Sequence, residues 1–354
     1  MENIIKNLLL ILCILFTSTS AGLAEEKTEK GGILEKPFSM FENKSENKTK
    51  PQVGKKSLND LRPRAIEIIQ QGLSDSDPMI RPNAIEIVVE TNQIRLMPKV
   101  EKLLKDDYVP VRFAAAIAIG DTQYKLAKKS VKQSLNDPDI NVQIAAAYAM
   151  IRLGSKDKSY EKKIYDALIN KDQTIRANAA AILGKLGTED NLAKLYWVLK
   201  DVDSEAMVRF QALESIAKLG DEKIIAKIWP TIISSYNDDR VFGIRALGEL
   251  GNAKAKEILI TKLDDDVLEV RLAAATQLGR LNDKTGEPEV LKVFEENLTS
   301  GLSKPDLERV NFFTTLAIGE IGTEALTQNL PGFLENDSKS VQLAAAKAVL
   351  QCTN

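Results

Sequence analysis

The chain has no histidine among its 354 residues, and this absence removes several kinds of catalytic site at once. A Ser-His-Asp triad and a Cys-His pair both need an imidazole to take the proton from the nucleophile. A histidine-based zinc or iron site is excluded for the same reason. Neither a Walker-type phosphate loop nor a Gly-x-Gly-x-x-Gly fingerprint is present. We therefore predict that the chain is not an enzyme and carries no catalytic residue and no cofactor.

Two acidic runs resemble metal-binding sequences but lack residues that such sites need. The run Asp201-Val202-Asp203-Ser204-Glu205 begins like a calcium loop, yet Ala206 stands where the loop needs glycine, and Ala212 where it needs the twelfth-position glutamate. The three aspartates at 264–266 fit a turn followed by a helix cap. The sequence therefore predicts no metal site.

Two groups of side chains are candidates for contact with a protein partner. Four lysines share the i, i+3, i+4, i+7 face of one expected helix: Lys125, Lys128, Lys129 and Lys132. Such a stripe could receive an acidic partner, or it could simply be a solvated helix face. Tyr196, Trp197 and Trp229 fall on expected second helices of consecutive units, where an exposed tryptophan would be a binding hot spot. Packing between adjacent units is the alternative for these aromatic residues.

These side chains are carried by an internal repeat that runs from about residue 60 to the end of the sequence. Its marker is the position of Arg176, which recurs at spacings of 31, 31, 33, 33, 31, 31, 40 and 31 residues. A fixed period of about 20 to 50 residues is the signature of a solenoid. The marker position is occupied in turn by Arg81, Arg112, Gln143, Arg176, Arg209, Arg240, Arg271, Asn311 and Gln342.

Two further positions repeat with the marker. The residue before it is Val or Ile in every copy except Asp239, and the residue three positions after it is small in nearly every copy. A small residue on the buried stripe lets two helices approach closely, and the arginine can turn its guanidinium towards a carboxylate or carbonyl at a helix end. The small position is occupied by Ala84, Ala115, Ala146, Ala179, Ala212, Gly243, Ala274, Thr314 and Ala345.

Each unit is expected to contain two helices, the first carrying the marker and the second an amphipathic face such as Leu192, Leu195 and Leu199. Glycines fall where each first helix should stop, as C-cap glycines do. These are Gly120, Gly154, Gly184, Gly220, Gly251, Gly279 and Gly322. Aromatic residues make up only 5% of the chain, and no alternating strand pattern persists, which supports an all-α fold.

The motif of Asp, Val-Arg, Ala and Leu-Gly resembles HEAT repeats, and its short period is most similar to the phycobilisome-lyase-type HEAT-like subclass. The resemblance implies a right-handed α-α superhelix, a HEAT/armadillo-like solenoid of about nine repeats of 31–33 residues. Ankyrin units contain a Thr-Pro-Leu-His turn, and tetratricopeptide units contain a tryptophan and a closing proline at fixed positions. These features are missing here. Some HEAT-repeat proteins are deoxyhypusine hydroxylases that hold iron with His-Glu pairs, and this chain lacks the histidines.

The expected order is one lone helix at Ala65–Leu73, eight helical pairs and a final lone helix at Val341–Gln351. The 40-residue spacing before Asn311 predicts a bulge from the Asp283–Pro288 loop and a long second helix. In this architecture second helices generally line the concave side, so we expect the lysines and tryptophans there.

The N-terminal residues read as targeting and tether segments. Residues 1–24 have an apolar run from Leu8 to Phe16 and small residues ending at Ala24, which predicts a cleaved signal peptide and an exported, periplasmic or secreted protein. No membrane span is expected after cleavage. Residues 25–57 are polar and broken by glycine and proline, which predicts a disordered linker before the solenoid of residues 58–354. Its Pro37–Phe41 run is either a docking peptide or a chance hydrophobic spot.

The net charge of −2 argues against nucleic acid as a partner, since nucleic-acid binders are usually clearly basic. After signal removal Cys352 is the only cysteine, so no intrachain disulfide is expected. We predict a non-catalytic scaffold of the cell envelope whose concave surface holds a protein partner. Two alternatives are a bilin lyase or isomerase-like enzyme, implied only by the family resemblance, and a purely structural envelope component. A bilin lyase works on a cytoplasmic or plastid chromoprotein, which fits an export signal poorly.

Overall fold

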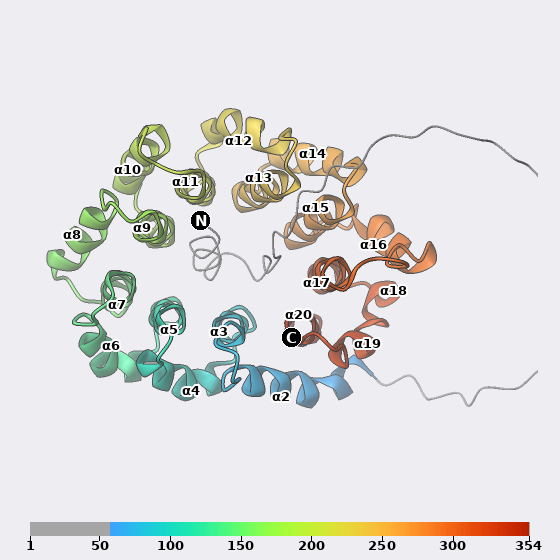
Figure 1. Cartoon of the computed structure of the whole chain (residues 1–354), viewed down its shortest axis with the longest axis horizontal. Coiled ribbons are helices and arrows are strands. Elements are labelled where there is room, and N and C mark those ends of the chain that lie inside the picture. The colour runs from blue at the N-terminus through green and yellow to red at the C-terminus, as the bar shows by residue number, and fades with distance from the viewer. Residues whose placement is uncertain (1–56, 354) are drawn as a thin grey trace, which may run out of the picture.

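The computed structural model describes residues 57–353, and every regular element in that part of the chain is helical. The helices form two concentric rows around a common axis (Figure 1). Within residues 57–353 the inner row is α3 (Ile80–Glu90), α5 (Val109–Asp121), α7 (Ile140–Arg152), α9 (Gln173–Leu186), α11 (Ala206–Lys218), α13 (Asn237–Leu250), α15 (Leu268–Arg280), α17 (Lys304–Ile321) and α20 (Lys339–Gln351).

The outer row consists of shorter helices, several of them extended by one turn of 3-10 helix. In the same described region it contains α2 (Arg62–Gly72), α4 (Met97–Lys102), α6 (Lys128–Ser134), α8 (Lys158–Ala167), α10 (Glu189–Lys200), α12 (Ile225–Ile232), α14 (Ala253–Thr261), α16 (Glu287–Glu295), α18 (Glu324–Thr327) and α19 (Leu330–Leu334). The prediction of an all-α solenoid of two-helix units is confirmed.

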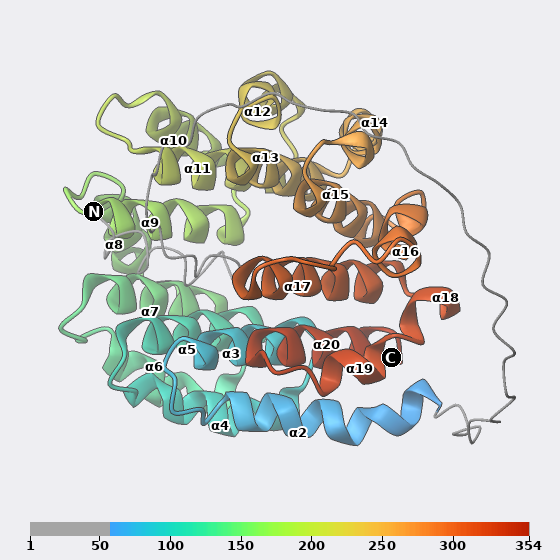
Figure 2. The same cartoon turned by 45° about the vertical axis from the view of Figure 1, so that its right-hand side comes forward.

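The solenoid closes on itself into a ring. The last inner helix, α20, packs against both α3 and α2, so α2 spans two inner helices as the other outer helices do (Figures 1 and 2). Polar contacts support this seam: Arg62 donates to the carbonyl of Thr353 at 2.9 Å, and Lys339 pairs with Asp75 at 2.8 Å. The two apparently lone helices at the ends of the repeat therefore pack on each other.

The Val-Arg helices line the inside of the ring, and the second helices lie outside. The expectation that second helices line the concave side is therefore wrong. The physical reason lies in the small position three residues after the marker. Its seven alanines are all fully buried: Ala84, Ala115, Ala146, Ala179, Ala212, Ala274 and Ala345. Helices with such small contact residues pack closely and form the row with the shorter circumference.

The arginines at the marker position bind carboxylates and carbonyls at helix ends, as their chemistry predicts. Arg112 donates to the carbonyl of Asp106 at 2.9 Å and forms a two-pronged contact with the Asp137 carboxylate at 2.8 and 2.9 Å. Asp137 in turn accepts the backbone N–H of Asp139 in the turn that leads into α7. The arginine thus ties the loop before its own helix to the loop before the next inner helix. Equivalent pairs join Arg81 to Asp106, Arg176 to Asp201 and Arg240 to Asp265.

The predicted C-cap glycines fall into two groups. Four of them, including Gly154 and Gly322, have positive φ at the end of a first helix, as a C-cap requires. Gly120, Gly184 and Gly279 instead lie inside α5, α9 and α15, where a neighbouring inner helix leaves no room for a side chain. For these three glycines the prediction of a cap is wrong, because close helix packing selects glycine there.

The extra residues in the long spacing before Asn311 do not lengthen the second helix as predicted. The second helix α16 is short, and the added residues form the turn at 296–303 and an extra N-terminal turn of α17. Arg309 follows that turn at the position two residues before the marker, and it pairs with Asp238 of α13 at 2.7 Å. The insertion therefore lengthens α17 and the turn before it, and leaves the second helix short.

The predicted signal peptide (1–24) and the Pro37–Phe41 segment lie outside the described residues, as does the linker (25–57) except for Ser57. Export and linker disorder stay predictions. Among the described helices, none combines the length and hydropathy that a membrane crossing requires.

Candidate functional site

The most chemically varied surface of the described region lies inside the ring, which we call the lumen. Nine residues after each marker, every inner helix carries a polar or charged residue near its C-terminus. These are Glu90, Asp121, Arg152, Lys185, Lys218, Glu249, Arg280, Glu320 and Gln351. Five residues after the marker, four more charged residues follow the same helices: Glu86, Glu214, Arg245 and Lys347. We call these two sets the lumen polar positions.

Most of these charges are paired across neighbouring helices. Lys347 on α20 contacts Glu90 on α3 at 2.9 Å and Glu320 on α17 at 3.4 Å, so one ammonium group joins both sides of the seam. Burial alone would favour the neutral amine, but the two carboxylates raise the pKa of Lys347. Lys347 therefore stays charged and holds α3, α17 and α20 together.

A second set of pairs runs around the opposite half of the lumen. The Glu249 carboxylate forms ion pairs with Lys218 at 3.4 Å and with Arg280 at 3.2 Å, and Arg245 pairs with Glu214 at 2.9 Å. Burial would raise the pKa of Glu249, but the two cations together hold it below its ordinary value. These ion pairs connect α11, α13 and α15 along their lumen side.

Tyr148 and Lys185 share one acidic partner in the lumen. The Tyr148 hydroxyl donates to Asp121, and Lys185 pairs with the other oxygen of the same carboxylate at 2.9 Å. Asp121 therefore links α7 and α9 to α5. Along the lumen the charges fall in blocks, with the anions Glu90 and Asp121 followed by the cations Arg152, Lys185 and Lys218.

Two cavities of about 140 Å³ each open among these charges. The first lies between α3, α13, α15, α17 and α20, and its wall combines Phe312, Phe313 and Leu316 with Arg245, Arg280 and Lys347. The second lies between α3, α5 and α9 and includes Phe113, Asp121 and Lys185. Both are bordered by Glu86 and Glu90, so these two residues stand at the boundary between the cavities.

Glu86 differs from the other acidic residues of the first cavity. Glu90 and Glu320 are paired with Lys347, whereas Glu86 forms no hydrogen bond or ion pair with any described residue. Its side chain is open to the lumen, so enclosure by the ring, not contact with the core, is what desolvates it. This enclosure and the Glu90 carboxylate raise the pKa of Glu86 to about 7.

Replacing Glu86 by glutamine should therefore change the pH dependence of stability. The folded chain binds the Glu86 proton more tightly than the unfolded chain, whose carboxyl has a pKa near 4.5. The native protein thus loses stability as pH rises from about 4.5 to about 7. We expect Glu86→Gln to have a higher Tm than the native chain at pH 8 and the same Tm near pH 4, as measured by circular dichroism. Glu257→Gln, at an exposed position of α14, should show no such pH-dependent difference, and an equal offset at both pH values would contradict the prediction.

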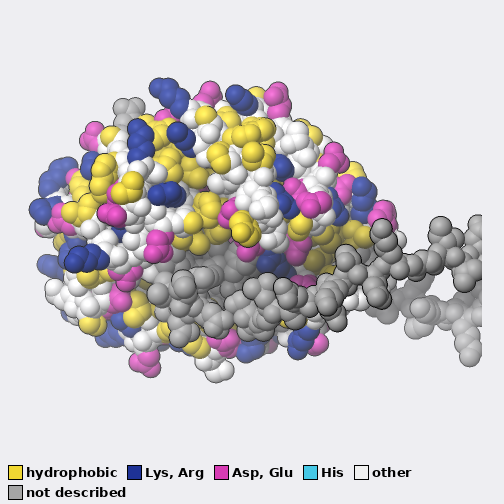
Figure 3. All heavy atoms as spheres, turned by 45° about the horizontal axis from the view of Figure 1, so that its top comes forward, with side chains coloured by type: hydrophobic (Ala, Val, Ile, Leu, Met, Phe, Trp, Pro, Cys, Tyr) yellow, Lys and Arg dark blue, Asp and Glu magenta, His cyan; other side chains and the backbone are white. Residues whose placement is uncertain are grey.

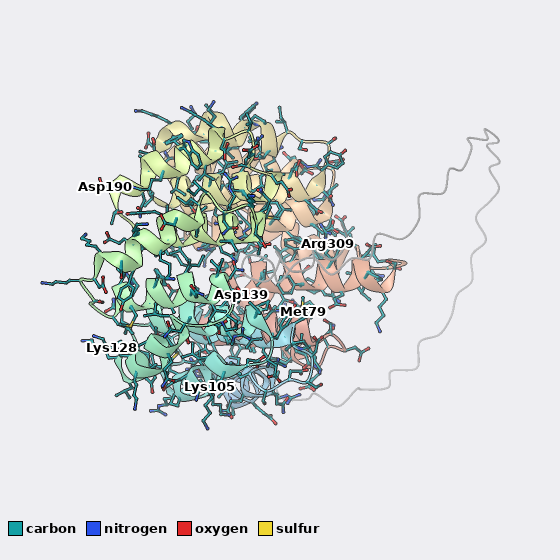
Figure 4. The ribbon with its side chains drawn as sticks, turned by 60° about the vertical axis from the view of Figure 1, so that its left-hand side comes forward. Met79, Lys105, Lys128, Asp139, Asp190 and Arg309 are labelled. Atoms are coloured by element: carbon teal, nitrogen blue, oxygen red, sulfur yellow. The ribbon has the colours of Figure 1, made fainter. Side chains whose placement is uncertain are left out.

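The residues predicted to bind a partner all lie on the outer row. Lys125, Lys128, Lys129 and Lys132 are exposed on α6 and the turn before it, and Figure 4 shows Lys128 at the outer wall. Trp197 on α10 and Trp229 on α12 are 48% and 50% exposed. Tyr196 is partly buried, and its hydroxyl donates to Asp221 at 3.0 Å, so it is a structural residue of α10. None of these residues contributes to the lumen.

The two tryptophans belong to a larger apolar patch. Figure 3 shows hydrophobic side chains gathered on the outer wall that α10 and α12 form. Ile169, Val202 and Ile233 occupy the position seven residues before three consecutive markers, and each is at least 60% exposed. In the other copies this position holds Ser74, Lys105, Asn136, Asp264, Lys304 and Glu335. The patch is therefore confined to three adjacent units.

Sequence reasoning missed the lumen. The signal was present, since the position nine after the marker is polar in all nine copies although the residues around it are mostly apolar. This signal differs from those of nucleophiles, metal ligands and nucleotide motifs, because it consists of one polar position repeated from helix to helix. A polar residue that recurs on an otherwise apolar helix indicates an enclosed polar surface.

Comparison with known proteins gives a family and two relatives. A family model described as HEAT repeats matches residues 161–240 and 233–305. The phycocyanobilin lyase subunit alpha of Nostoc sp. PCC 7120 is 37% identical over 112 residues, which cover 31% of this chain and 41% of that protein. The subunit of the same name from Picosynechococcus sp. PCC 7002 is 30% identical over 112 residues and is covered to 42%. The matched region thus spans about two fifths of the length of these curated relatives.

Solved structures with similar helical arrays have low identity to the chain. The complex of CpcE and CpcF of phycocyanin lyase from Nostoc sp. PCC 7120 is similar at 17% identity and a TM-score of 0.30, covering 87% of this chain and 98% of that one. Human deoxyhypusine hydroxylase is similar at 15% identity and a TM-score of 0.36, covering 75% and 97%. These similarities concern the class of helical repeat alone.

The relatives correct two predictions. The reading of the chain as a non-catalytic scaffold is wrong, and so is the prediction that it is not an enzyme, because both relatives are lyase subunits. The absence of histidine excludes only chemistry that needs an imidazole, so it does not exclude every enzyme. The resemblance to HEAT repeats of the phycobilisome-lyase type is confirmed.

Proposed function

We propose that this chain, whose HEAT repeats are similar to those of the phycobilisome-lyase type, acts as a bilin lyase, or as one subunit of such a lyase. In this role it binds a linear tetrapyrrole and promotes its attachment to an acceptor protein. The observation that carries the proposal is the 37% identity over 112 residues to a phycocyanobilin lyase subunit.

The chemistry of the lumen supports this proposal. A linear tetrapyrrole combines an apolar conjugated surface, pyrrole nitrogens and carboxylate side chains. The first lumen cavity offers a group for each of these parts: the partly exposed Leu316 as apolar surface, Glu86 as an acceptor, and Arg280 and Lys347 as cations. Both cations also pair with carboxylates of the ring, so a ligand would share them. Each cavity alone is smaller than the roughly 300–1,000 Å³ of ordinary ligand sites. Binding therefore requires the two cavities to join at their shared border of Glu86 and Glu90.

A partner protein, if the chain is one subunit, would bind on the outer wall in this proposal. The seam buries α2 and α20 against each other, so neither end of the solenoid offers a free helix face. The apolar patch of Ile169, Trp197, Val202, Trp229 and Ile233 is then the best-suited contact surface, because exposed tryptophans contribute most of the binding energy at many interfaces. The lysines of α6 lie outside this patch on the same wall.

The test is to incubate the purified chain with phycocyanobilin and an apo-chromoprotein, and to measure bilin that stays on the acceptor after denaturation. The experiment is run without and with extract of the source cells, so that a missing second subunit is supplied. We expect the chain to shift the bilin absorption on its own and to increase covalent transfer to the acceptor. If the chain neither changes the bilin spectrum nor increases transfer in either condition, the proposal is wrong.

A further inference from the structure

Glu86 stands out in the lumen because its carboxyl has no partner while its neighbours do. Within the first cavity Glu90 and Glu320 both form ion pairs with Lys347. Arg280 pairs with Glu249, and Arg245 pairs with Glu214. Glu86 lines this cavity and the second one and makes no contact of ion-pair length with the described residues. A carboxylate held at the centre of an enclosed polar surface without a donor is an open acceptor site.

We propose that Glu86 is the ligand-binding acceptor of the lumen, whose carboxylate accepts hydrogen bonds from the N–H groups of a bound tetrapyrrole. The inference rests on the proposed function and assigns a residue to it. Glu86 acts by binding and orienting the ligand, so it is a positioning residue and not a group that forms or breaks a covalent bond.

The surroundings of Glu86 favour an organic N–H donor over the other possible ligands. A metal ion needs several ligands together, and within residues 57–353 no group of three or more His, Cys, Asp or Glu side chains is placed to hold one. An anion is disfavoured because Glu90 stands one helical turn away on the same face of α3. Leu316, which lines the first cavity and is partly exposed, offers apolar surface that a conjugated ring system would cover, whereas Phe312 and Phe313 are buried in the core.

The position of Glu86 also suits a ligand longer than either cavity. Because it borders both cavities, a carboxylate there meets the middle of a ligand that extends into each of them. In a linear tetrapyrrole the nitrogens lie along the inner edge of the chain and the carboxylates on its central rings. A central acceptor at Glu86 matches the nitrogens. The carboxylates would share Arg280 and Lys347 in one cavity and Lys185 in the other with the acidic partners that these cations already have in the ring.

Binding should then depend on pH in a way that reports on Glu86. Enclosure and Glu90 raise its pKa, so at pH 6 much of the free protein carries a neutral carboxyl there. N–H donors bind the carboxylate better than the acid, so affinity should rise from pH 6 to pH 8. The charged groups that face Glu86 from the surrounding helices are Glu90, Asp121, Lys185, Arg245, Arg280, Glu320 and Lys347.

The experiment titrates phycocyanobilin into the full-length chain and into Glu86→Gln, Glu86→Asp and Glu257→Gln, with bilin absorbance as the readout at pH 6, 7 and 8. Loss of a hydrogen bond to a charged group predicts that Glu86→Gln binds about 10- to 100-fold more weakly at pH 8. Its affinity should also no longer rise with pH. Glu86→Asp keeps the charge on a shorter side chain and should fall between the two, and Glu257→Gln should bind as the native chain does.

The outcomes separate this inference from the proposed function. If the native chain binds no bilin at all, the proposed function fails, and the role of Glu86 fails with it. If the native chain binds bilin and Glu86→Gln binds it equally well with the same pH profile, only the role of Glu86 is overturned. Circular dichroism of each variant checks the fold, and should Glu86→Gln unfold, the comparison of Glu86→Asp with Glu257→Gln decides in the same way.

Discussion

Replacing Arg112 by methionine is expected to lower the free energy of unfolding by about 3 kcal/mol, the low end of the range for breaking a buried ion pair. The side chains of Arg112 and Asp137 are 12% and 11% exposed, so both charges depend on each other and not on water. Methionine keeps the apolar stem but removes the donor to the Asp106 carbonyl and both guanidinium hydrogen bonds to Asp137, whose carboxylate keeps the backbone N–H of Asp139. The measurement is urea unfolding of both proteins at pH 7.

The marker position also provides a matched control. Arg209 is exposed, and the contact found for it is a 3.3 Å bond to the carbonyl of Asp201. Arg209→Met should therefore cost less than about 1 kcal/mol, as surface contacts usually do. Equal losses in the two variants would mean that the marker arginines stabilise the ring through their apolar stems and not through the carboxylate.

Gly279→Ala is expected to destabilise the ring by about 1–3 kcal/mol, which is the usual cost of overpacking a close contact. A Cβ at Gly279 would lie 2.8 Å from the carbonyl carbon of Glu320 and 2.9 Å from the backbone nitrogen of Ile321. Backbone atoms cannot rotate away as a side chain does, so α15 and α17 must move apart. Thermal unfolding followed by circular dichroism measures the loss.

Gly332 provides the comparison, because it is also helical and a Cβ there meets no atom within 4 Å. Gly332→Ala should leave stability unchanged or raise it by up to about 1 kcal/mol, since alanine loses less backbone entropy in a helix. If Gly279→Ala were as harmless as Gly332→Ala, the close approach of α15 and α17 would not be what selects glycine.

The local structure of each unit was predictable from the sequence. The β-branched residue, the arginine and the small residue at fixed spacing predicted a buried helix face, and Ala146 and Ala179 are fully buried as expected. The ion pairs of Arg81 and Arg176 also follow from the chemistry of the marker. These features were accessible because each depends on contacts within one unit or between adjacent units.

The closure of the ring was not predictable in the same way. It depends on a small rotation between successive units that accumulates around the described solenoid, and no single residue pattern reports that angle. The assignment of inner and outer helices depends on the same curvature. The lumen site followed from closure, so Glu86 and Lys347 could not be recognised as neighbours before the ends of the solenoid were brought together.

Closure also changes what kind of variation the molecule can tolerate. An open solenoid can gain or lose a unit at an end and keep the packing of the rest. Here an added or deleted unit would strain every joint at once or force α20 away from α3, because the circumference must match a whole number of units. Since Arg62 touches Thr353, a chain cut in an outer loop and rejoined across the seam would instead keep the same circumference and enclose the same lumen.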